Sequence, residues 1–364
     1  MVKVVENRPS KHLIFIPFLF AAIALIALPA SAQSSSAQST PVIPAQQALK
    51  TTTELVKLSV SVLDDSGNFV DGLKQQDFHV FDNGAESPIS YFAPVTDAAK
   101  VVVVLETGPS VFLIKNEHVA AAYALLQGLA PDDQVALITY SDVPREVLPF
   151  TADKAQLLNA LGNVEYMMGS ADLNLYATVS NLLGGLAQYP GKKAIVLLTT
   201  GLDSSPSSQW TSLTQKLRGS DVVIFSVGLL GPVLAANAKN RKHSKKISGA
   251  SAFASGDVQQ SPALAKAHQG LIDLSQMTGG QAYFPQSGQE FIPDYRQIAA
   301  CLRNEYVIGV APQHDGQFHK LSVTVAAPDT DILGKKKHKK KKKKKHSETD
   351  YRLYFRQGYV APAR

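Results

Sequence analysis

The chain has little cysteine and lacks the motifs that mark common enzyme classes. Cys301 is the only cysteine among 364 residues, so no disulfide can form within the chain and the fold must depend on its hydrophobic core. There is no His-Glu-x-x-His zinc motif, no Gly-x-Ser-x-Gly nucleophile elbow and no phosphate-binding Gly-Lys-Thr loop. The nine histidines show no spacing typical of metal ligands. We therefore expect a protein that is not an enzyme.

The chain also lacks a broad excess of positive charge, despite a net charge of +6. Ten of the eleven residues at 335–345 are lysine. Without those ten lysines the net charge is −4, and without the three basic and one acidic residues of 1–32 it is −6. A mildly acidic body excludes nucleic-acid binding over the whole surface.

The first 32 residues have the pattern of a secretory signal peptide. Basic residues precede an apolar stretch at 13–28, and the sequence at 30–32 matches the small-x-small cleavage pattern. We expect cleavage after Ala32 and an exported protein, either periplasmic or secreted. The alternative is a retained membrane anchor, since the sixteen apolar residues fall just below membrane-spanning length.

The rest of the chain divides by composition. A Ser-, Gln- and Pro-rich stretch predicts a flexible linker, and alternating apolar and polar residues after it predict a small β module. The segments are a signal peptide at 1–32, a linker at 33–52, a β module at 53–97, an α/β domain at 98–312 with a disordered basic insertion at 232–262, and C-terminal β strands at 313–364 with a lysine-rich insertion at 334–346.

Between residues 98 and 312, predicted strands alternate with predicted helices. This order favours an α/β fold with a doubly wound, mainly parallel sheet, to which small N-terminal and C-terminal β appendages are attached. Strands are predicted at 100–105, 135–140, 146–150, 193–199, 222–229, 280–284 and 306–310, and helices at 114–129, 174–188, 210–217, 263–277 and 292–303. A further helix, capped by the residues at 151–154, is predicted to contain Leu157, Leu158 and Leu161.

Two buried strands of this domain end abruptly in polar residues. The apolar run at 101–105 stops at Glu106-Thr107-Gly108-Pro109-Ser110, and the run at 195–198 stops at Thr199-Thr200. Ligand sites of open α/β sheets lie at the carboxyl ends of such strands. These loops are therefore the candidate functional site.

Several strings resemble the von Willebrand factor A (VWFA) family, and more narrowly its secreted VWFA-related proteins of acidobacterial type. They span most of the chain after the predicted signal peptide and comprise GLKQQDF at 72–78, VVVLETGPS at 102–110, KKAIVLLTTG at 192–201, LRNEYVIG at 302–309 and RQGYVAP at 356–362. The resemblance implies a Rossmann-like VWFA domain that acts in extracytoplasmic binding or adhesion. It also implies a divalent cation, often Mg²⁺, held in a metal-ion-dependent adhesion site.

The sequence departs from the pattern that the family implies for this cation site. Glu106 replaces the first Asp of Asp-x-Ser-x-Ser and Gly108 replaces the first Ser, while Ser110 is retained. The threonine position falls on Leu173, and the last Asp position falls on Thr200. Mg²⁺ demands near-ideal geometry from oxygen ligands. We therefore interpret the site as degenerate and expect no cofactor.

The alternative interpretation keeps a cation on Glu106, Ser110 and Thr200. In the interpretation that we favour, the loop is vestigial, and Thr107 and Ser110 cap the following helix. In either case the predicted binding rim consists of the polar residues of these loops: Glu106, Thr107, Ser110, Asp172, Thr200 and Asp203.

Three functions remain open. The leading hypothesis is a non-enzymatic extracytoplasmic module that recognises a protein or an envelope polymer. The second is attachment to acidic lipid or polysaccharide, without sequence-specific nucleic-acid binding, through Lys335, Lys336, Lys337, Lys339, Lys340, Lys341, Lys342, Lys343, Lys344 and Lys345. The third is cation-dependent adhesion through a non-standard site.

Overall fold

The computed structural model describes residues 55–168, 172–243, 261–287, 289–326 and 351–363. All of them belong to one compact unit, Thr52–Arg364. The predicted signal peptide and linker and the lysine run lie outside the described residues. Within the described ranges, no helix combines the length and the apolar character needed to cross a membrane.

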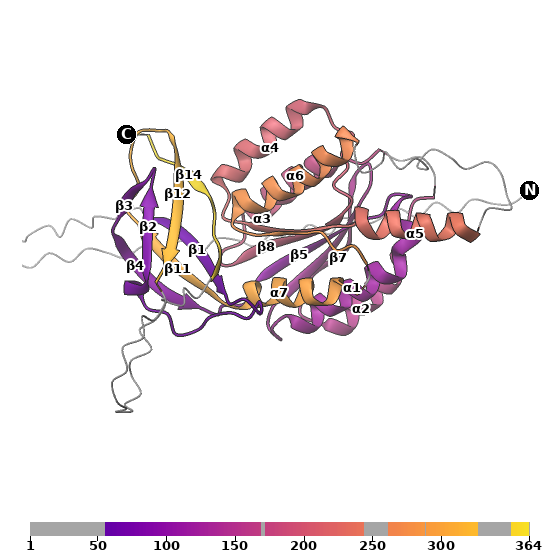
Figure 1. The fold of residues 1–364 in the computed structure, drawn as a ribbon, viewed down its shortest axis with the longest axis horizontal. Helices are drawn as coiled ribbons and strands as arrows, with labels where there is room; N and C mark the ends of the chain where they lie inside the picture. Colours follow the sequence, from indigo (N-terminus) through magenta and orange to yellow (C-terminus); the bar gives the residue numbers. More distant parts are fainter. Residues whose placement is uncertain (1–54, 169–171, 244–260, 288, 327–350, 364) are drawn as a thin grey trace, which may run out of the picture. The chain divides into compact units, whose positions relative to one another are not determined.

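The α/β domain is built on a six-stranded sheet (Figure 1). The sheet is mainly parallel, as predicted, but the strand predicted at 306–310 is not part of it. The neighbouring strands pair in parallel, except β7, which runs antiparallel to β6. Burial on both faces explains why β5 and β8 are nearly continuous apolar runs. In spatial order the strands are β10 (Ala282–Tyr283), β9 (Val223–Gly228), β8 (Lys193–Thr199), β5 (Lys100–Glu106), β6 (Gln134–Tyr140) and β7 (Pro144–Thr151).

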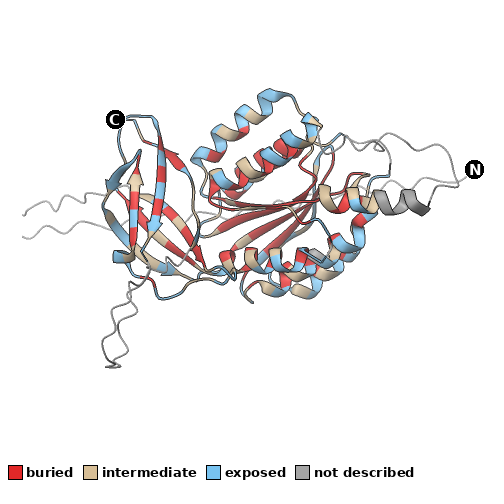
Figure 2. Cartoon of the chain, in the orientation of Figure 1, coloured by how far each residue is buried: buried red, intermediate tan, exposed pale blue. Residues whose placement is uncertain are grey.

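Helices cover both faces of this sheet (Figures 1 and 2). One face is covered by α1 (Lys115–Gly128), α2 (Lys154–Gly162) and α7 (Phe291–Arg303), and the other by α3 (Leu175–Leu186), α4 (Ser207–Gly219) and α6 (Pro262–Thr278). Alternate residues of β5 point to opposite faces: Val101 and Val103 pack in the core with the first three helices, and Val102 and Val104 pack in the core with the other three. Cys301 is buried in α7, as expected of a small apolar side chain.

The N-terminal and C-terminal β segments form one two-sheet sandwich. In one sheet β1 (Val56–Leu63) pairs with β11 (Glu305–Val310) and β13 (Arg352–Tyr354), while β4 (Ile89–Val95) pairs with β11. The other sheet has the order β14 (Gly358–Val360), β12 (Phe318–Val325), β2 (Phe78–Asp82) and β3 (Ala85–Ser87). The two sheets share one apolar core.

The domain boundaries that follow from this strand pairing differ from those predicted from the sequence. The segments 53–97 and 313–364 are not separate appendages, and β11, placed in the α/β domain at 98–312, belongs to the sandwich. About 45 residues of β structure cannot bury an apolar face alone, so the N-terminal strands take partners from the far end of the chain.

The basic insertion predicted at 232–262 also begins differently. Its first part is helical, because α5 (Leu230–His243) continues through it. Pro232 lies in the first turn of α5, where a missing N–H costs nothing, and the alanines that follow are strong helix formers. The remainder of the insertion, at 244–260, lies outside the described residues.

A covered ion pair connects the sandwich to the α/β domain. Lys192, just before β8, lies 3.1 Å from Glu305 of β11, and their side chains are only 7% and 8% exposed. The Nζ of Lys192 also donates to the backbone oxygen of Cys301. A charge buried in this way depends on its partner, because removal of one leaves the other without compensation.

We predict that Lys192→Met lowers the free energy of unfolding by about 3–5 kcal/mol, because it strands the buried Glu305 carboxylate. Urea denaturation measures this change. The double variant Lys192→Met/Glu305→Leu should recover most of the loss. Arg145→Met, which breaks an exposed ion pair with Asp142, serves as the control and should cost less than about 1 kcal/mol. If Lys192→Met and Arg145→Met lower the free energy of unfolding by the same amount, the prediction is wrong.

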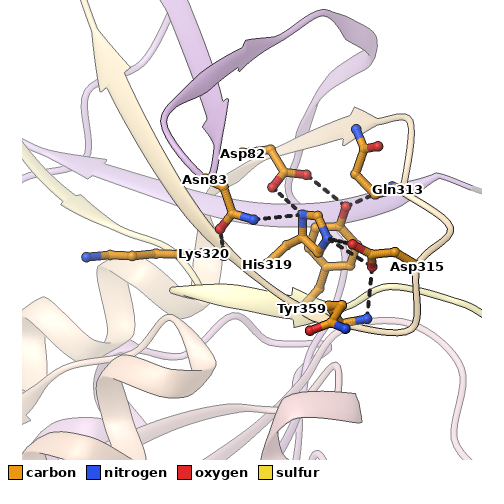
Figure 3. Close-up of polar contacts among 8 residues, drawn as sticks. Asp82, Asn83, Gln313, Asp315, His319, Lys320 and Tyr359 are labelled. Atoms are coloured by element: carbon orange, nitrogen blue, oxygen red, sulfur yellow. Dashed lines mark hydrogen bonds and ion pairs between the residues drawn. The ribbon is translucent and has the colours of Figure 1, made fainter.

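A second polar network joins the two ends of the chain inside the sandwich (Figure 3). His319 of β12 contacts Asp82 of β2 through Nδ1 at 2.6 Å and Asp315 through Nε2 at 3.1 Å. The hydroxyl of Tyr359 donates to the other Asp82 oxygen at 2.9 Å. The hydrogen bond to Asp82, with a further contribution from Asp315, raises the pKa of His319 above its ordinary value of 6.5.

This raised pKa makes the contribution of His319 to stability dependent on pH. A histidine that is charged more readily in the folded state stabilises fully below its unfolded pKa of about 6.5, and the contribution is lost as pH rises through the folded pKa. We predict that the difference in Tm between the native protein and His319→Gln shrinks as pH rises from about 6 to 9. His314→Gln, at an exposed position, is the control. If the Tm difference between the native protein and His319→Gln stays constant from about pH 6 to 9, His319 does not stabilise the fold through its positive charge.

Candidate functional site

The carboxyl group of Glu106 lies at the centre of the predicted site. Its side chain is fully buried at the end of β5, and its Oε2 atom accepts hydrogen bonds from Thr199, the last residue of β8, and from Thr200, which follows it. Thr199 Oγ1 and Thr200 Oγ1 each donate at 2.8 Å, and the Thr200 N–H donates at 2.7 Å. The carboxyl group thus ties the loop after β5 directly to the loop after β8.

Tyr140, at the end of β6, completes this cluster. Its hydroxyl lies 3.3 Å from Glu106 Oε2 and 2.5 Å from Thr199 Oγ1. Since the Thr199 hydroxyl donates to the carboxyl group, the Tyr140 hydroxyl is the donor to Thr199. Burial raises the pKa of Glu106, and burial together with the charge of Glu106 raises the pKa of Tyr140. The Oε1 atom of Glu106 is buried without a hydrogen-bond partner among the described residues.

Backbone hydrogen bonds hold the surrounding loops together. The Met167 N–H donates to the Thr107 oxygen at 2.8 Å, which joins the segment after α2 to the β5 loop. The Ser204 N–H donates to the Leu173 oxygen at 2.7 Å, and Ser204 Oγ accepts from the Leu173 N–H. Four segments of the chain therefore meet at the carboxyl end of the sheet, which is the position that the sequence predicts for a site.

Comparison with known proteins shows what the domain that carries this site is similar to. Residues 101–267, a little under half of the chain, match the family model of the von Willebrand factor type A (VWA) domain. We therefore describe the α/β domain as VWA-like. No curated protein matches the chain significantly.

Solved structures similar to this chain include proteins described as of the von Willebrand factor type. A von Willebrand factor type A protein from Catenulispora acidiphila is 11% identical, with a TM-score of 0.42, and the match covers 77% of this chain and 72% of that one. An aerotolerance-related membrane protein from Bacteroides fragilis is 14% identical, with a TM-score of 0.39 and coverages of 56% and 98%. The vWF domain of the pili tip protein Mfa5 from Porphyromonas gingivalis is 20% identical, with a TM-score of 0.27 and coverages of 30% and 40%.

The residues around Glu106 do not fit an octahedral cation site. The Oε2 atom of Glu106 already accepts from three neighbouring groups, and the Thr200 hydroxyl is one of those donors. Leu173 places a methyl carbon 3.0 Å from the point where a Cβ on residue 108 would lie, so a serine there would have to displace it. Within the described ranges, no cluster of three or more His, Cys, Asp or Glu residues is arranged to hold a metal. Hydrogen bonds thus engage Glu106 Oε2 and the Thr200 hydroxyl, two of the oxygens that a cation would need, while Glu106 Oε1 has no partner among the described residues.

The structure divides the predicted rim into a buried base and a surface. Glu106, Thr107 and Thr200 are buried, with exposures of 0%, 5% and 1%, so they cannot contact a large partner directly. Ser110 and Asp203 are partly exposed and Asp172 is exposed. These three belong to the surface of the site.

Two of the roles expected for rim residues are different in the structure. Ser110 has helical backbone angles at the start of the short 3-10 helix Val111–Ile114, and its side chain makes no capping hydrogen bond. Thr107 Oγ1 donates to the Tyr140 oxygen instead of capping a helix. The capping expectation is wrong, because the chain turns directly from the loop into helical geometry. Asp203 has a role that was not expected: it accepts from the Tyr176 N–H in the first turn of α3.

The sequence analysis missed the apolar part of this surface. Leu113, Met167 and Met168 are 40%, 36% and 67% exposed beside the polar loops. The pair Met167-Met168, outside any predicted helix or strand, was the available signal in the sequence. Tyr140 and Thr199 were missed as partners of Glu106, since nothing in the sequence indicates which neighbour fills the space left by a cation.

We predict that Glu106→Ala lowers the free energy of unfolding by at least about 3 kcal/mol, because it leaves several buried donors without an acceptor. Glu106→Gln should retain most of that stability, since its amide oxygen can accept the same hydrogen bonds and no charge is buried. Urea denaturation at neutral pH distinguishes the two variants. If both lose the same amount, the hydrogen-bonded cluster is not what stabilises the loops.

Proposed function

We propose that this protein is a non-enzymatic, extracytoplasmic binding module whose VWA-like domain recognises a protein or an envelope polymer without a divalent cation. Its contact region, here called the rim surface, consists of exposed or partly exposed residues at the carboxyl end of the sheet: Ser110, Leu113, Met167, Met168, Asp172 and Ser204.

One observation carries this proposal: the loops of the rim surface are preformed by internal hydrogen bonds. The contacts of Glu106 with Thr199 and Thr200 hold two loops, and those of Thr107 and Leu173 hold two more. A surface that is ordered before binding loses less entropy when a partner docks. Cation-dependent recognition needs an open coordination position, and the donor set around Glu106 supports recognition without one.

The mixed character of the rim surface favours a macromolecular partner. Exposed methionine and leucine side chains beside serine and aspartate are typical of protein interfaces, and methionine adapts readily to a partner. The signal-peptide pattern at 1–32 and the narrower resemblance to secreted VWFA-related proteins support a location outside the cytoplasm.

Attachment through Lys335–Lys345 is the second candidate, because ten lysines in eleven positions can attract polyanions. That segment lies outside the described residues. Electrostatic attachment of this kind weakens steeply as salt rises, whereas contact through the rim surface depends on the side chains of four loops. The two functions can therefore be separated by salt and by deletion.

We predict that Met168→Glu and Leu113→Glu each weaken binding to isolated envelopes of the source organism by about tenfold or more, because each places a charge in an apolar contact. Binding is measured by cosedimentation at physiological salt. Tyr91→Glu, at a similarly exposed apolar residue on β4, is the matched control and should bind normally.

Two further arms of this experiment distinguish the alternatives. A chelator should leave binding unchanged, and loss of binding in EDTA would favour a cation-dependent adhesin. Deletion of residues 335–345 should also leave binding unchanged. If binding is lost in the deletion variant but retained in Met168→Glu, the envelope-binding function belongs to the lysine run and not to the rim surface.

A further inference from the structure

The outward side of α1 is apolar although the helix lies at the surface of the domain. From Val119 to Gln127 the helix contains no charged residue. Tyr123 is 46% exposed, and Ala120 and Gln127 are exposed beside it. A surface helix normally carries charged residues on its outer face, and one that is apolar on all sides is usually covered.

This side of α1 forms the floor of a groove of about 950 Å³. Leu158 and Leu161 of α2 contribute to one wall, and Ile292 of α7, itself 46% exposed, contributes to another. On α1 the lining residues extend from Lys115 to Gln127, a span of about 18 Å at 1.5 Å per residue. The groove has the length of a helix of about 12 residues.

The charges at this groove are all of one sign. Lys115 and Arg296 line it, and no Asp or Glu is among the described residues that do so. Both side chains are exposed, and neither takes part in an ion pair within the described ranges. The Lys115 ammonium lies 4.9 Å from the ring centroid of Phe112, another lining residue. On a chain whose body is acidic, this is a local apolar surface with positive charge.

We propose that this groove binds an acidic amphipathic helix of a partner protein. The apolar residues of such a helix, spaced at i, i+3, i+4 and i+7, would lie on α1, and its carboxylates would reach Lys115 and Arg296. The small side chains of Ala120 and Ala124, one turn apart, allow another helix to approach closely.

The charge pattern disfavours a second copy of this chain as the occupant. A twofold contact brings the same surface of both copies together, so Lys115 and Arg296 would face equivalent cations. Among the described residues, the groove shares no lining residue with the rim surface, although Phe112 and Tyr166 of the groove are next in the chain to Leu113 and Met167 of the rim surface. The proposal therefore does not depend on the proposed function of the rim.

The test is a peptide selection against the full-length protein, purified from a host that exports it. The library displays helix-forming peptides of about 14 residues. Ala120→Arg, which fills the groove without removing its positive charge, serves for counter-selection. Peptides retained by the native protein should combine the i, i+3, i+4, i+7 apolar pattern with Asp and Glu. Thermal unfolding confirms that the variant, at an exposed position, is folded.

Affinities of the selected peptides, measured by fluorescence anisotropy, give the second readout. The double variant Lys115→Glu/Arg296→Glu should bind them at least about tenfold more weakly, whereas the rim variant Met168→Glu should bind them normally. A loss in Met168→Glu alone would place the peptides on the rim surface and overturn the assignment to the groove.

Other outcomes overturn the proposal outright. In one such outcome, the native protein retains no peptides beyond those that the Ala120→Arg variant also retains, or it retains basic peptides. Another is groove-dependent binding of dodecanoate or of anionic phosphatidylglycerol vesicles without peptide binding, which would assign the groove to a lipid. A dimer in sedimentation that Ala120→Arg dissociates would assign it to a second copy of the chain.

Discussion

The buried carboxyl group of Glu106 is the interaction on which the arrangement of the binding loops depends. It lies at the end of the central strand β5, accepts hydrogen bonds from the threonines that end and follow β8, and lies 3.3 Å from the Tyr140 hydroxyl at the end of β6. Because three adjacent strands meet at this cluster, the loops that continue from them have fixed starting points. The desolvation of this group is offset by hydroxyl and amide donors. The same contacts leave the surface above it to side chains such as Met168, which are free to meet a partner.

The sequence predicts the α/β domain well because its signals are local. The buried strand at 101–105 is a continuous apolar run, Asp153 caps α2 as its position before the helix suggests, and Gly279 ends α6 with a left-handed backbone. The sandwich is harder to predict, because the pairing of β1 with β11 and of β2 with β12 joins residues more than 230 positions apart, as the contact of Tyr306 with Leu73 does.

The candidate site shows the same division between local and distant information. Gly108, Leu173 and Thr200 at the positions of the expected ligands could be recognised in the sequence, and they are the basis for predicting a degenerate cation site. The hydrogen-bonded cluster at this place depends on how Tyr140 and Thr199 are placed in space, which the sequence of one loop does not contain. The apolar groove along α1 is a further case, since its walls come from helices that precede and follow most of the domain.

The pairing of the two ends of the chain has a consequence for biogenesis. The chain is synthesised from its N-terminus, so β1 and β2 are made first, yet their partners β11 to β14 follow the whole VWA-like domain. Closing so long a loop costs entropy, and such contacts form late. The VWA-like domain can therefore fold before β1 and β2 have their partners, and the sandwich is completed only when residues 352–360 have been added. Over that interval the unpaired edges of the early strands are open to pairing with other chains, so this stage of folding is the one most exposed to aggregation.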